Sequence, residues 1–397
     1  MDPPEKPGPQ DPAYVALHVC AKLPTNRNFQ DMYIVVGGMQ IAGPPLTGGG
    51  GQRETGANNT PKTYGQLLQT NSLFEGLVVQ SNEIPNFASF DEVDVKSYGN
   101  TAEAANPSGS VSMIVKSGGN QFHGRYSEFG QNHRFQSNNI DDALRQQGLT
   151  VGDAMVWQHD FTGDIGGRVV RNKLWFYFAV KDVRGFRTVP GYVDGPGPDG
   201  VYLTGDEPIG QDEEGAPAQT FKISYQAAPN HKFVAFGSRT PLFEWGQSGS
   251  RFVPREATVR HQEHDYALKP IEWQWVVNNR INVNMLAGKS GYHAIRGLQH
   301  GSENFPSKLN RETGLTTGAT FNAAIGTRTP ARPQVIGRID YFPLNHFLGS
   351  HGIQAGYRLQ WGSFETDFPS QPYGNYQLIS DRVGGVPRFR ARKENTL

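Results

Sequence analysis

The sequence predicts a mainly β protein, in which a small α/β domain precedes the antiparallel strands of a transmembrane β-barrel. Two patterns lead to this prediction. Strand-length segments within residues 158–363 alternate between apolar and polar side chains, and the connections between them are alternately short and long. Alternation with a period of two is typical of β-strands. A strand with one apolar and one polar face separates two environments, which in an outer-membrane barrel are lipid and a water-filled interior.

Composition narrows the class of protein. The 397 residues carry a formal net charge of zero, so charge gives no argument for nucleic-acid binding. No run of about 18 apolar residues is present, which excludes a transmembrane helix by sequence. Cys20 is the single cysteine, so no internal disulfide is possible. The first residues lack the basic and apolar regions of a signal peptide, and we therefore expect a fragment of a longer protein.

The alternation is clearest in three segments. In each of them one face is apolar and the other polar: Ile281, Val283, Met285 and Ala287 against Arg280, Asn282 and Asn284; Phe221, Ile223 and Tyr225 against Lys222, Ser224 and Gln226; Ile353, Ala355, Tyr357, Leu359 and Trp361 against Gln354, Arg358 and Gln360. Residues 174–180 are apolar on both faces. We expect one face of that strand to contact lipid and the other to pack against the N-terminal domain.

The elements follow in order along the chain. Residues 1–22 form a Pro-rich leader that we leave unassigned, and residues 23–119 form the small domain, with a short helix or turn at 66–74 and strands at 90–96 and 110–116. About ten strands follow, near residues 122–130, 158–167, 173–183, 219–227, 232–238, 264–277, 280–292, 334–342, 352–363 and 375–392. Short turns at 168–172, 228–231 and 278–279 alternate with long loops at 131–157, 184–218, 239–263 and 293–333. Short periplasmic turns and long outer loops characterise outer-membrane barrels.

Five motifs occur in a fixed order: LPTNRNFQD at 23–31, FDEVDVK at 90–96, VSMIVK at 111–116, SGGNQFHG at 117–124, and DIGGR at 164–168 followed by NKLWFY at 172–177. Together they resemble the TonB-dependent outer-membrane receptors, of the type with an N-terminal carboxypeptidase-regulatory-like domain. The resemblance implies that residues 23–119 form part of a plug domain. It also implies that residues 120–397 form the N-terminal part of a barrel of about 22 strands.

The resemblance also implies a function and a location. Such receptors lie in the outer membrane of Gram-negative bacteria, are not enzymes and need no cofactor. They bind a scarce, bulky nutrient such as a siderophore, cobalamin or an oligosaccharide, and import it with energy delivered by TonB. No TonB-box-like segment precedes residue 23, and the chain ends without the terminal aromatic strand of these barrels. These departures again indicate a fragment covering the plug and the first part of the barrel.

Two sets of residues are candidates for this function. We expect ligand contacts from loop 184–218 and from a glycine-rich loop: Gly48, Gly49, Gly50, Gly51, Gln52 and Arg53. We expect polar residues of the barrel interior to hold the plug: Lys222, Arg280, Arg338, Asp340 and Arg358. In a wet interior each such contact is worth little, which suits a plug that must move.

Other readings of the same residues stay open. His261 and His264 are three apart, which on a strand places them on opposite faces, so we expect no metal site there. The glycine run lacks the Lys-Ser/Thr of a phosphate-binding loop. Asp91, Glu92 and Asp94 resemble the paired carboxylates of glycoside cleavage, but we interpret them as a polar plug strand that faces a water-filled interior. The alternative function is a secreted all-β carbohydrate-binding module or glycan-active protein.

Overall fold

A computed structural model describes thirteen stretches of the chain: residues 39–41, 61–63, 66–67, 71–79, 86–96, 110–137, 140–148, 152, 154–321, 325–343, 351–369, 376–383 and 385–393. Most of these residues are in β-strands, as the sequence predicts. Their helices are short: η2 (Phe87–Ser89), η3 (His133–Phe135), α3 (Asp142–Gln146) and η4 (Arg255–Ala257). None of these is long and apolar enough to cross a membrane.

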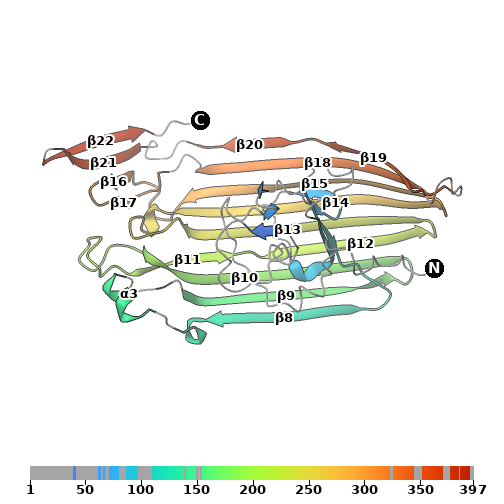
Figure 1. Ribbon diagram of the computed structural model, residues 1–397, viewed down its shortest axis with the longest axis horizontal. Helices are drawn as coiled ribbons and strands as arrows, with labels where there is room; N and C mark the ends of the chain where they lie inside the picture. Colours follow the sequence, from blue (N-terminus) through green and yellow to red (C-terminus); the bar gives the residue numbers. More distant parts are fainter. Residues whose placement is uncertain are drawn as a thin grey trace.

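The largest unit is a curved antiparallel sheet of eleven strands, which we call the wall (Figure 1). Its strands are β8 (His123–Asn132), β9 (Ala154–Val170), β10 (Leu174–Val193), β11 (Ile209–Gly215), β12 (Ala218–Ala228), β13 (His231–Gln247), β14 (Val259–Asn278), β15 (Ile281–Leu298), β18 (Gly326–Tyr341), β19 (Ile353–Gln360) and β20 (Ser363–Asp367). The long connections after β8, β10, β13 and β15 gather at one end of the wall, and the short turns after β9, β12 and β14 lie at the other end together with the longer connection 342–352 (Figure 1). This arrangement confirms the predicted alternation of loop lengths.

Many wall strands extend beyond the predicted limits at the loop end. β10 continues to Val193, and β11 lies within the segment 184–218 that we predicted as loop. The connection that remains there is 194–208. A bilayer is crossed by about 9–11 residues of a tilted strand, so strands of 16–20 residues project past it.

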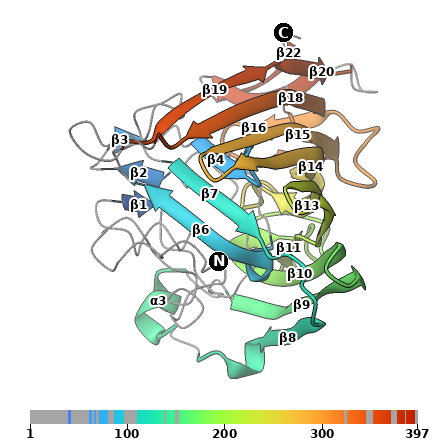
Figure 2. The same ribbon diagram turned by 90° about the vertical axis from the view of Figure 1, so that its right-hand side faces the viewer.

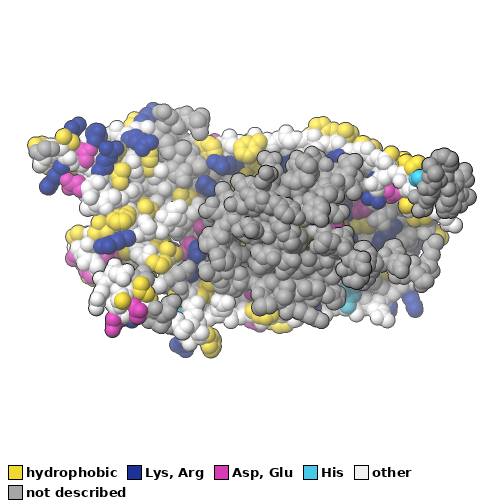
Figure 3. Space-filling view, in the orientation of Figure 1, with side chains coloured by type: hydrophobic (Ala, Val, Ile, Leu, Met, Phe, Trp, Pro, Cys, Tyr) yellow, Lys and Arg dark blue, Asp and Glu magenta, His cyan; other side chains and the backbone are white. Residues whose placement is uncertain are grey.

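The wall is polar on its inner face and apolar on its outer face. β12 shows this most plainly, because Thr220, Lys222 and Ser224 are buried whereas Phe221 and Ile223 are more than 40% exposed. β19 is exposed on both faces, and yellow hydrophobic side chains gather over it in Figure 3. In water such an arrangement would expose apolar surface at a cost of about 25 cal/mol per Å². The arrangement is stable where the outer solvent is lipid.

A second sheet lies across the concave side of the wall (Figure 2). We call it the inner sheet; it comprises β5 (Leu77–Val79), β4 (Asn71–Phe74), β7 (Ser110–Val115) and β6 (Phe90–Lys96). Its apolar side chains and those of the wall form one core: Phe74, Val79, Phe90, Val93, Val95, Val111, Met113 and Val115 with Tyr177, Ala179, Phe236 and Ala267. Strand β10 thus contacts the inner sheet through Tyr177 and Ala179 while Phe178 faces outward, as its two apolar faces predict.

The prediction of a short helix or turn at 66–74 was wrong. That segment contains β3 (Gln66–Leu67) and β4, and β3 pairs with β2 (Pro61–Thr63), which pairs with β1 (Met39–Ile41). β4 forms because it pairs in parallel with β7, from Asn71 opposite Ser110 to Phe74 opposite Met113. Pairing with a strand far along the chain, which the local residues do not reveal, makes this segment extended.

The final predicted barrel strand, 375–392, is also placed differently. It forms the hairpin of β21 (Tyr376–Val383) and β22 (Val386–Lys393), which joins β16 (Ser307–Asn310) and β17 (Thr316–Thr317) in a separate sheet. β21 pairs in parallel with β16, a strand within the predicted loop 293–333. Basic side chains gather around β22 at the loop end (Figure 3). This hairpin belongs to the outer loops and not to the wall.

The segment 117–122 carries the chain from the inner sheet to the first wall strand. Asn120 fixes it to the turn between β9 and β10, since its Oδ1 accepts from the backbone N–H of Asn172 at 2.9 Å and from Trp175 Nε1 at 3.0 Å. Gly118 lies so close to the wall that a Cβ atom there would be 2.2 Å from the carbonyl oxygen of Phe176. In the SGGNQFHG motif, close packing therefore requires Gly118, and hydrogen bonds to the wall require Asn120.

Candidate functional site

The contact between the inner sheet and the wall begins at a two-residue turn between β4 and β5. Glu75 and Gly76 occupy the turn, and both have positive φ angles, 52° and 83°. Two positive φ angles define the type I′ hairpin turn, in which Asn or Asp normally precedes Gly. A glutamate in the left-handed region is uncommon, and its conformation costs about 1–2 kcal/mol. The position is held because the carboxylate of Glu75 is bound on several sides.

Glu75 joins two lysines of the wall. Its Oε1 lies 2.8 Å from Lys222 Nζ and accepts from the backbone N–H of Val115 at 2.7 Å. Its Oε2 lies 3.0 Å from Lys269 Nζ, which also donates to the backbone carbonyl of Glu75 at 3.1 Å. Glu75, Lys222 and Lys269 are all less than 8% exposed. The ion pairs are therefore buried, in contrast to the solvated contacts that we expected.

Glu272 completes the group and balances its charge. Lys269 also forms an ion pair with Glu272, whose Oε1 accepts from Gln274 and Asn284 at 2.7 and 2.8 Å. Two glutamates and two lysines thus share one buried network, which we call the Glu75 cluster (Glu75, Lys222, Lys269 and Glu272). Such a network is stable only when its members remain paired, because an unpaired buried charge costs several kcal/mol.

A β-bulge places Lys269 and Glu272 on the same face of β14. Phe236 lies opposite Lys269 and Val234 opposite Glu272, so three steps along β14 match two along β13. Pro270, which has no N–H to give to the sheet, stands inside the bulge. Residues three apart on a regular strand face opposite ways, so the bulge is what allows both side chains to enter the cluster.

Two further contacts fix the inner sheet to the wall. The backbone of Val78 in β5 is satisfied by wall side chains, because its N–H donates to Gln334 Oε1 at 2.9 Å and its carbonyl accepts from Ser290 Oγ at 2.7 Å. At the other side of the inner sheet, Lys116 Nζ lies 2.9 Å from Asp164 Oδ2. The hydrogen bonds of Val78 cover the edge strand β5, which would otherwise expose unpaired backbone groups.

The predicted plug contacts have different places in the structure. Lys222 lies in the Glu75 cluster, as described. Arg338 Nε pairs with Asp340 Oδ1 of the same strand at 3.0 Å, and Arg280 is exposed at the turn between β14 and β15. Arg358 is half-buried in β19. Contact of Arg280, Arg338, Asp340 and Arg358 with the plug stays a prediction. The residues from Gly48 to Arg53 lie outside the described part of the chain.

Sequence reasoning missed Glu75, Lys269 and Gln334. A signal for Glu75 was present, since Glu75-Gly76 stands between the apolar runs Leu73-Phe74 and Leu77-Val78-Val79, the pattern of a tight hairpin. Pro270 inside a predicted strand was a signal for the bulge. Nothing local marks Gln334, whose partner Val78 is 256 residues away.

A polar cavity of about 450 Å³ opens on the inner face of the wall near its loop end. Ten residues line it: Arg187, Val189, Asp212, Glu244, Gly246, Gln247, Ser248, Gly249, Val259 and Arg296. They come from β10, β11, β13, β14, β15 and the loop after β13. Side chains of both charges and amide and hydroxyl groups therefore face one space, as needed to bind a polar ligand in several directions.

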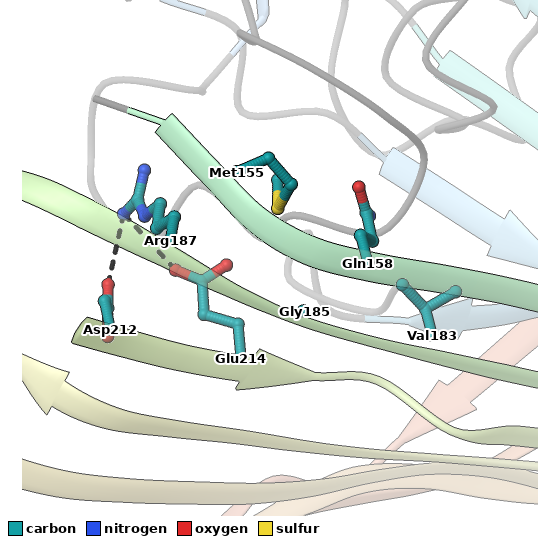
Figure 4. Close-up of a pocket in the computed structure, with 7 residues that line it drawn as sticks. All are labelled: Met155, Gln158, Val183, Gly185, Arg187, Asp212 and Glu214. Carbon is teal, nitrogen blue, oxygen red and sulfur yellow. Dashed lines mark hydrogen bonds and ion pairs between the residues drawn. The ribbon is translucent and has the colours of Figure 1, made fainter. Parts of the chain in front are cut away.

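Arg187, which lines this cavity, forms ion pairs with two carboxylates (Figure 4). Arg187 Nη2 lies 3.2 Å from Asp212 Oδ2 and 3.4 Å from Glu214 Oε1. One carboxylate oxygen from each of Asp212, Glu214 and Glu244 lies within 4.8 Å of the others, a spacing that could hold a metal ion. The Arg187 guanidinium supplies one positive charge beside these carboxylates.

The two histidines of β14 face opposite sides of the wall, as the spacing predicts. His261 is buried inside, with Nε2 3.4 Å from Glu263 Oε2. His264 faces outward, and its Nδ1 lies 3.5 Å from Arg239 Nη2. They cannot ligate one metal ion together.

Comparison with known proteins agrees with this architecture. Residues 114–241 match the family model described as an outer membrane beta barrel domain. Over about nine-tenths of its length the chain also superimposes on solved receptors. This chain has the fold of the outer-membrane β-barrel receptors. The matched domain model and this fold place its strands in the outer membrane of a Gram-negative bacterium. In outer-membrane barrels in general, the short turns face the periplasm.

Three solved structures illustrate the receptor fold. The siderophore receptor PirA of Pseudomonas aeruginosa is 11% identical with a TM-score of 0.56, and the alignment covers 91% of this chain and 51% of PirA. The outer membrane transporter YddB of Escherichia coli is 10% identical with a TM-score of 0.69, covering 92% and 49%. A mutant of the ferric enterobactin receptor PfeA of P. aeruginosa is 13% identical with a TM-score of 0.55, covering 88% and 49%.

The chain thus spans about half the length of the solved structures it matches. These neighbours are receptors and a transporter rather than enzymes. No curated protein matches the sequence.

Proposed function

We propose that this chain forms the plug and the first part of the barrel of a TonB-dependent receptor, and that the receptor takes up a bulky, scarce nutrient. In this proposal the inner sheet belongs to the plug predicted at residues 23–119, and the wall is the barrel part of residues 120–397. The observation that carries the proposal is the Glu75 cluster, because it fixes a separate small sheet inside a membrane wall.

The proposed ligand site is the cavity at the loop end, together with the predicted loop from Gly48 to Arg53. Arg187 and Arg296 provide donors for carboxylate or catecholate oxygens, and Gln247 and Ser248 provide neutral hydrogen bonds. Among the three nutrient classes expected from the sequence, an oxygen-rich siderophore fits this lining best. The names of the neighbouring PirA and PfeA receptors favour the same class.

Direct binding tests the ligand. The chain is folded in detergent micelles and titrated with ferric enterobactin, cyanocobalamin and maltohexaose by calorimetry. We expect ferric enterobactin to bind, and the variant R187Q/R296Q to bind it at least about tenfold more weakly, a loss of about 1.4 kcal/mol. The matched control R171Q/K308Q removes the same charge at exposed positions away from the cavity and should keep the affinity. Equal weakening in both variants, or binding of none of the three ligands, contradicts the proposed site.

Uptake tests the proposed partner. Cells that express the gene containing this chain should accumulate the bound ligand, and a protonophore should abolish accumulation without changing surface binding. Such a result supports energy delivery by TonB from the inner membrane, whereas uptake that survives the protonophore contradicts it.

The alternative of a secreted carbohydrate-active protein has less support. Asp91 and Glu92 are exposed on β6 and do not face the cavity residues. A soluble protein would also have to cover the outward apolar face of the wall.

A further inference from the structure

A tight turn at the end of β13 supplies four of the residues that line the polar cavity. It comprises residues 246–249, and we call it the 246–249 turn. The Gly249 N–H donates to the Gly246 carbonyl oxygen at 3.0 Å and closes the turn. Ser248, at its third position, has a φ angle of 71°. A type II turn needs such a positive angle at its third position and normally has glycine there, so the backbone is strained at Ser248.

The ring of Tyr192 packs against glycines of this turn and of β11. Tyr192 lies near the end of β10 and is only 2% exposed. A Cβ atom added at Gly249 would lie 2.4 Å from the ring, and one added at Gly210 of β11 would lie 2.6 Å from it. A Cβ atom at Gly246 would lie 3.0 Å from the Tyr192 hydroxyl oxygen. The first two distances are well below van der Waals contact, so the ring fits because Gly249 and Gly210 have no side chain.

Tyr192 is not one of the residues that line the cavity, so it acts on a ligand only through the turn. Its hydroxyl lies near Thr258 and Asp212, but it makes no hydrogen bond of standard length and angle within the described part of the chain. A buried hydroxyl without such a bond does not stabilise a fold. The aromatic ring, and not the hydroxyl, therefore holds the turn.

A second contact fixes the turn to the wall. Gln247 Nε2 donates to Glu244 Oε2 at 2.9 Å, and Glu244 is buried on β13. Ser248 is exposed in contrast. The turn is thus held on both sides of Ser248, by Glu244 at Gln247 and by Tyr192 at Gly249. Strained residues that their surroundings hold in place are typical of ligand-binding sites.

We propose that Tyr192 is a positioning residue of the ligand cavity, whose ring holds the 246–249 turn in the strained conformation that presents Gln247 and Ser248 to the ligand. This role rests on the proposed function, because it requires that the cavity binds the nutrient. A preorganised turn saves the cost of ordering these side chains during binding. When a site is in its binding conformation for only a fraction of the time, the apparent affinity falls by that fraction.

Calorimetry of the full chain in detergent micelles tests this role, with ferric enterobactin as the probe. We expect Gly249→Ala to bind it at least about tenfold more weakly, as when the turn is in its binding conformation about a tenth of the time. Tyr192→Leu removes the flat ring and should weaken binding similarly. Tyr192→Phe keeps the ring and should stay within about twofold of the original affinity. The matched control is Gly119→Ala, where the added Cβ would have no atom within 4 Å, and it should also stay within about twofold.

The binding curve separates positioning from a structural role. If Tyr192 only stabilised the fold, Gly249→Ala would reduce the number of binding sites per chain and leave their dissociation constant unchanged. Positioning instead raises the dissociation constant. The double variant G249A/Y192L should bind no more weakly than the weaker of the two single variants, because both disturb one contact. Fewer sites at an unchanged dissociation constant, or losses that add in the double variant, overturn the proposal.

Amide hydrogen exchange of the ligand-free chain separates this role from the proposed function. Tyr192→Leu should accelerate exchange of the Gly249 N–H, which closes the turn, and Tyr192→Phe should not. Unchanged exchange in Tyr192→Leu overturns the role of Tyr192, whether or not a ligand binds. If exchange accelerates but the original chain binds none of ferric enterobactin, cyanocobalamin and maltohexaose, the proposed function is overturned and the hold of Tyr192 on the turn stands.

Discussion

Lys222 Nζ lies 2.8 Å from Glu75 Oε1, although 147 residues separate the two in the chain. This ion pair connects the inner sheet to the middle of the wall, and it is buried together with Lys269 and Glu272. A buried pair of this kind need not stabilise the fold more than apolar residues would. It does make separation of the two sheets depend on a small number of charged groups.

Removing one member of the Glu75 cluster should therefore be costly. We expect Glu75→Gln to lower the free energy of unfolding by about 3–5 kcal/mol, because Lys222 and Lys269 would keep their burial with one carboxylate fewer. Urea titration followed by tryptophan fluorescence measures the loss. Glu92→Gln makes the same change at an exposed position of the inner sheet and should stay within about 0.5 kcal/mol. Similar losses in both variants would show that the cluster carries no special weight.

The two faces of β15 should respond differently to the same charge. Met285 lies on the outward apolar face of β15, formed by Ile281, Val283, Met285 and Ala287, and Asn282 lies on the inner face. Met285→Arg should cost about 2–4 kcal/mol in phosphatidylcholine vesicles, as expected for a basic residue near the bilayer midplane. Asn282→Arg should cost much less. Equal tolerance of arginine at both positions contradicts the membrane placement of the wall.

Gly118 should be much less tolerant of a side chain than its neighbour. A Cβ at Gly118 would lie 2.2 Å from the Phe176 carbonyl oxygen, whereas a Cβ at Gly119 would have no atom within 4 Å. Gly118→Ala should destabilise the protein by about 1–3 kcal/mol, the range for forced overpacking, and Gly119→Ala should have little effect. Denaturant midpoints compare them. If both variants unfold at the same denaturant concentration, the close packing of segment 117–122 against the wall is not needed for stability.

Loop 194–208 should open in acid. Slight burial raises the pKa of Glu207, but hydrogen bonds from backbone N–H groups outweigh it and lower that pKa below its usual value. Two of these donors are the N–H groups of Thr204 and Gly205, at 2.8 and 3.0 Å. A lowered folded-state pKa gives stability that is present above the unfolded pKa of about 4.3 and is lost as pH falls through the folded value.

Amide hydrogen exchange measures this loop opening. Exchange at Thr204 and Gly205, corrected for the intrinsic pH dependence, should accelerate as pH falls below about 4.3. Glu207→Gln should exchange faster at neutral pH and show no such acceleration. Protection that persists unchanged in acid argues against a role for the Glu207 carboxylate.

Much of the wall could be predicted from the sequence. The period of two identified its strands and the direction of their faces, because each strand has lipid on one side and polar interior on the other, and this requirement acts on every second residue. Lys222 was recognised for the same reason, as a cation on a polar face. Turn residues such as Pro229-Asn230 and Asn279 set the short connections, since turn formation is a local property.

Other features depended on distant partners. β4 became a strand because β7 pairs with it, and β21 left the wall because β16 offers it a parallel partner. The predicted strands were too short at the loop end. The prediction relied on alternating apolar and polar residues, and strand segments that extend beyond the bilayer do not need an apolar face.

The sequence by itself determined that alternate residues of this chain face two different solvents, since that choice is made residue by residue through hydrophobicity. Only the tertiary structure decided which charges meet. Glu75 reaches Lys222 and Lys269 because a left-handed turn and a β-bulge bring together groups that are up to 194 residues apart. Ion pairing depends on distances of a few ångströms in space, and no local pattern of residues encodes such a distance.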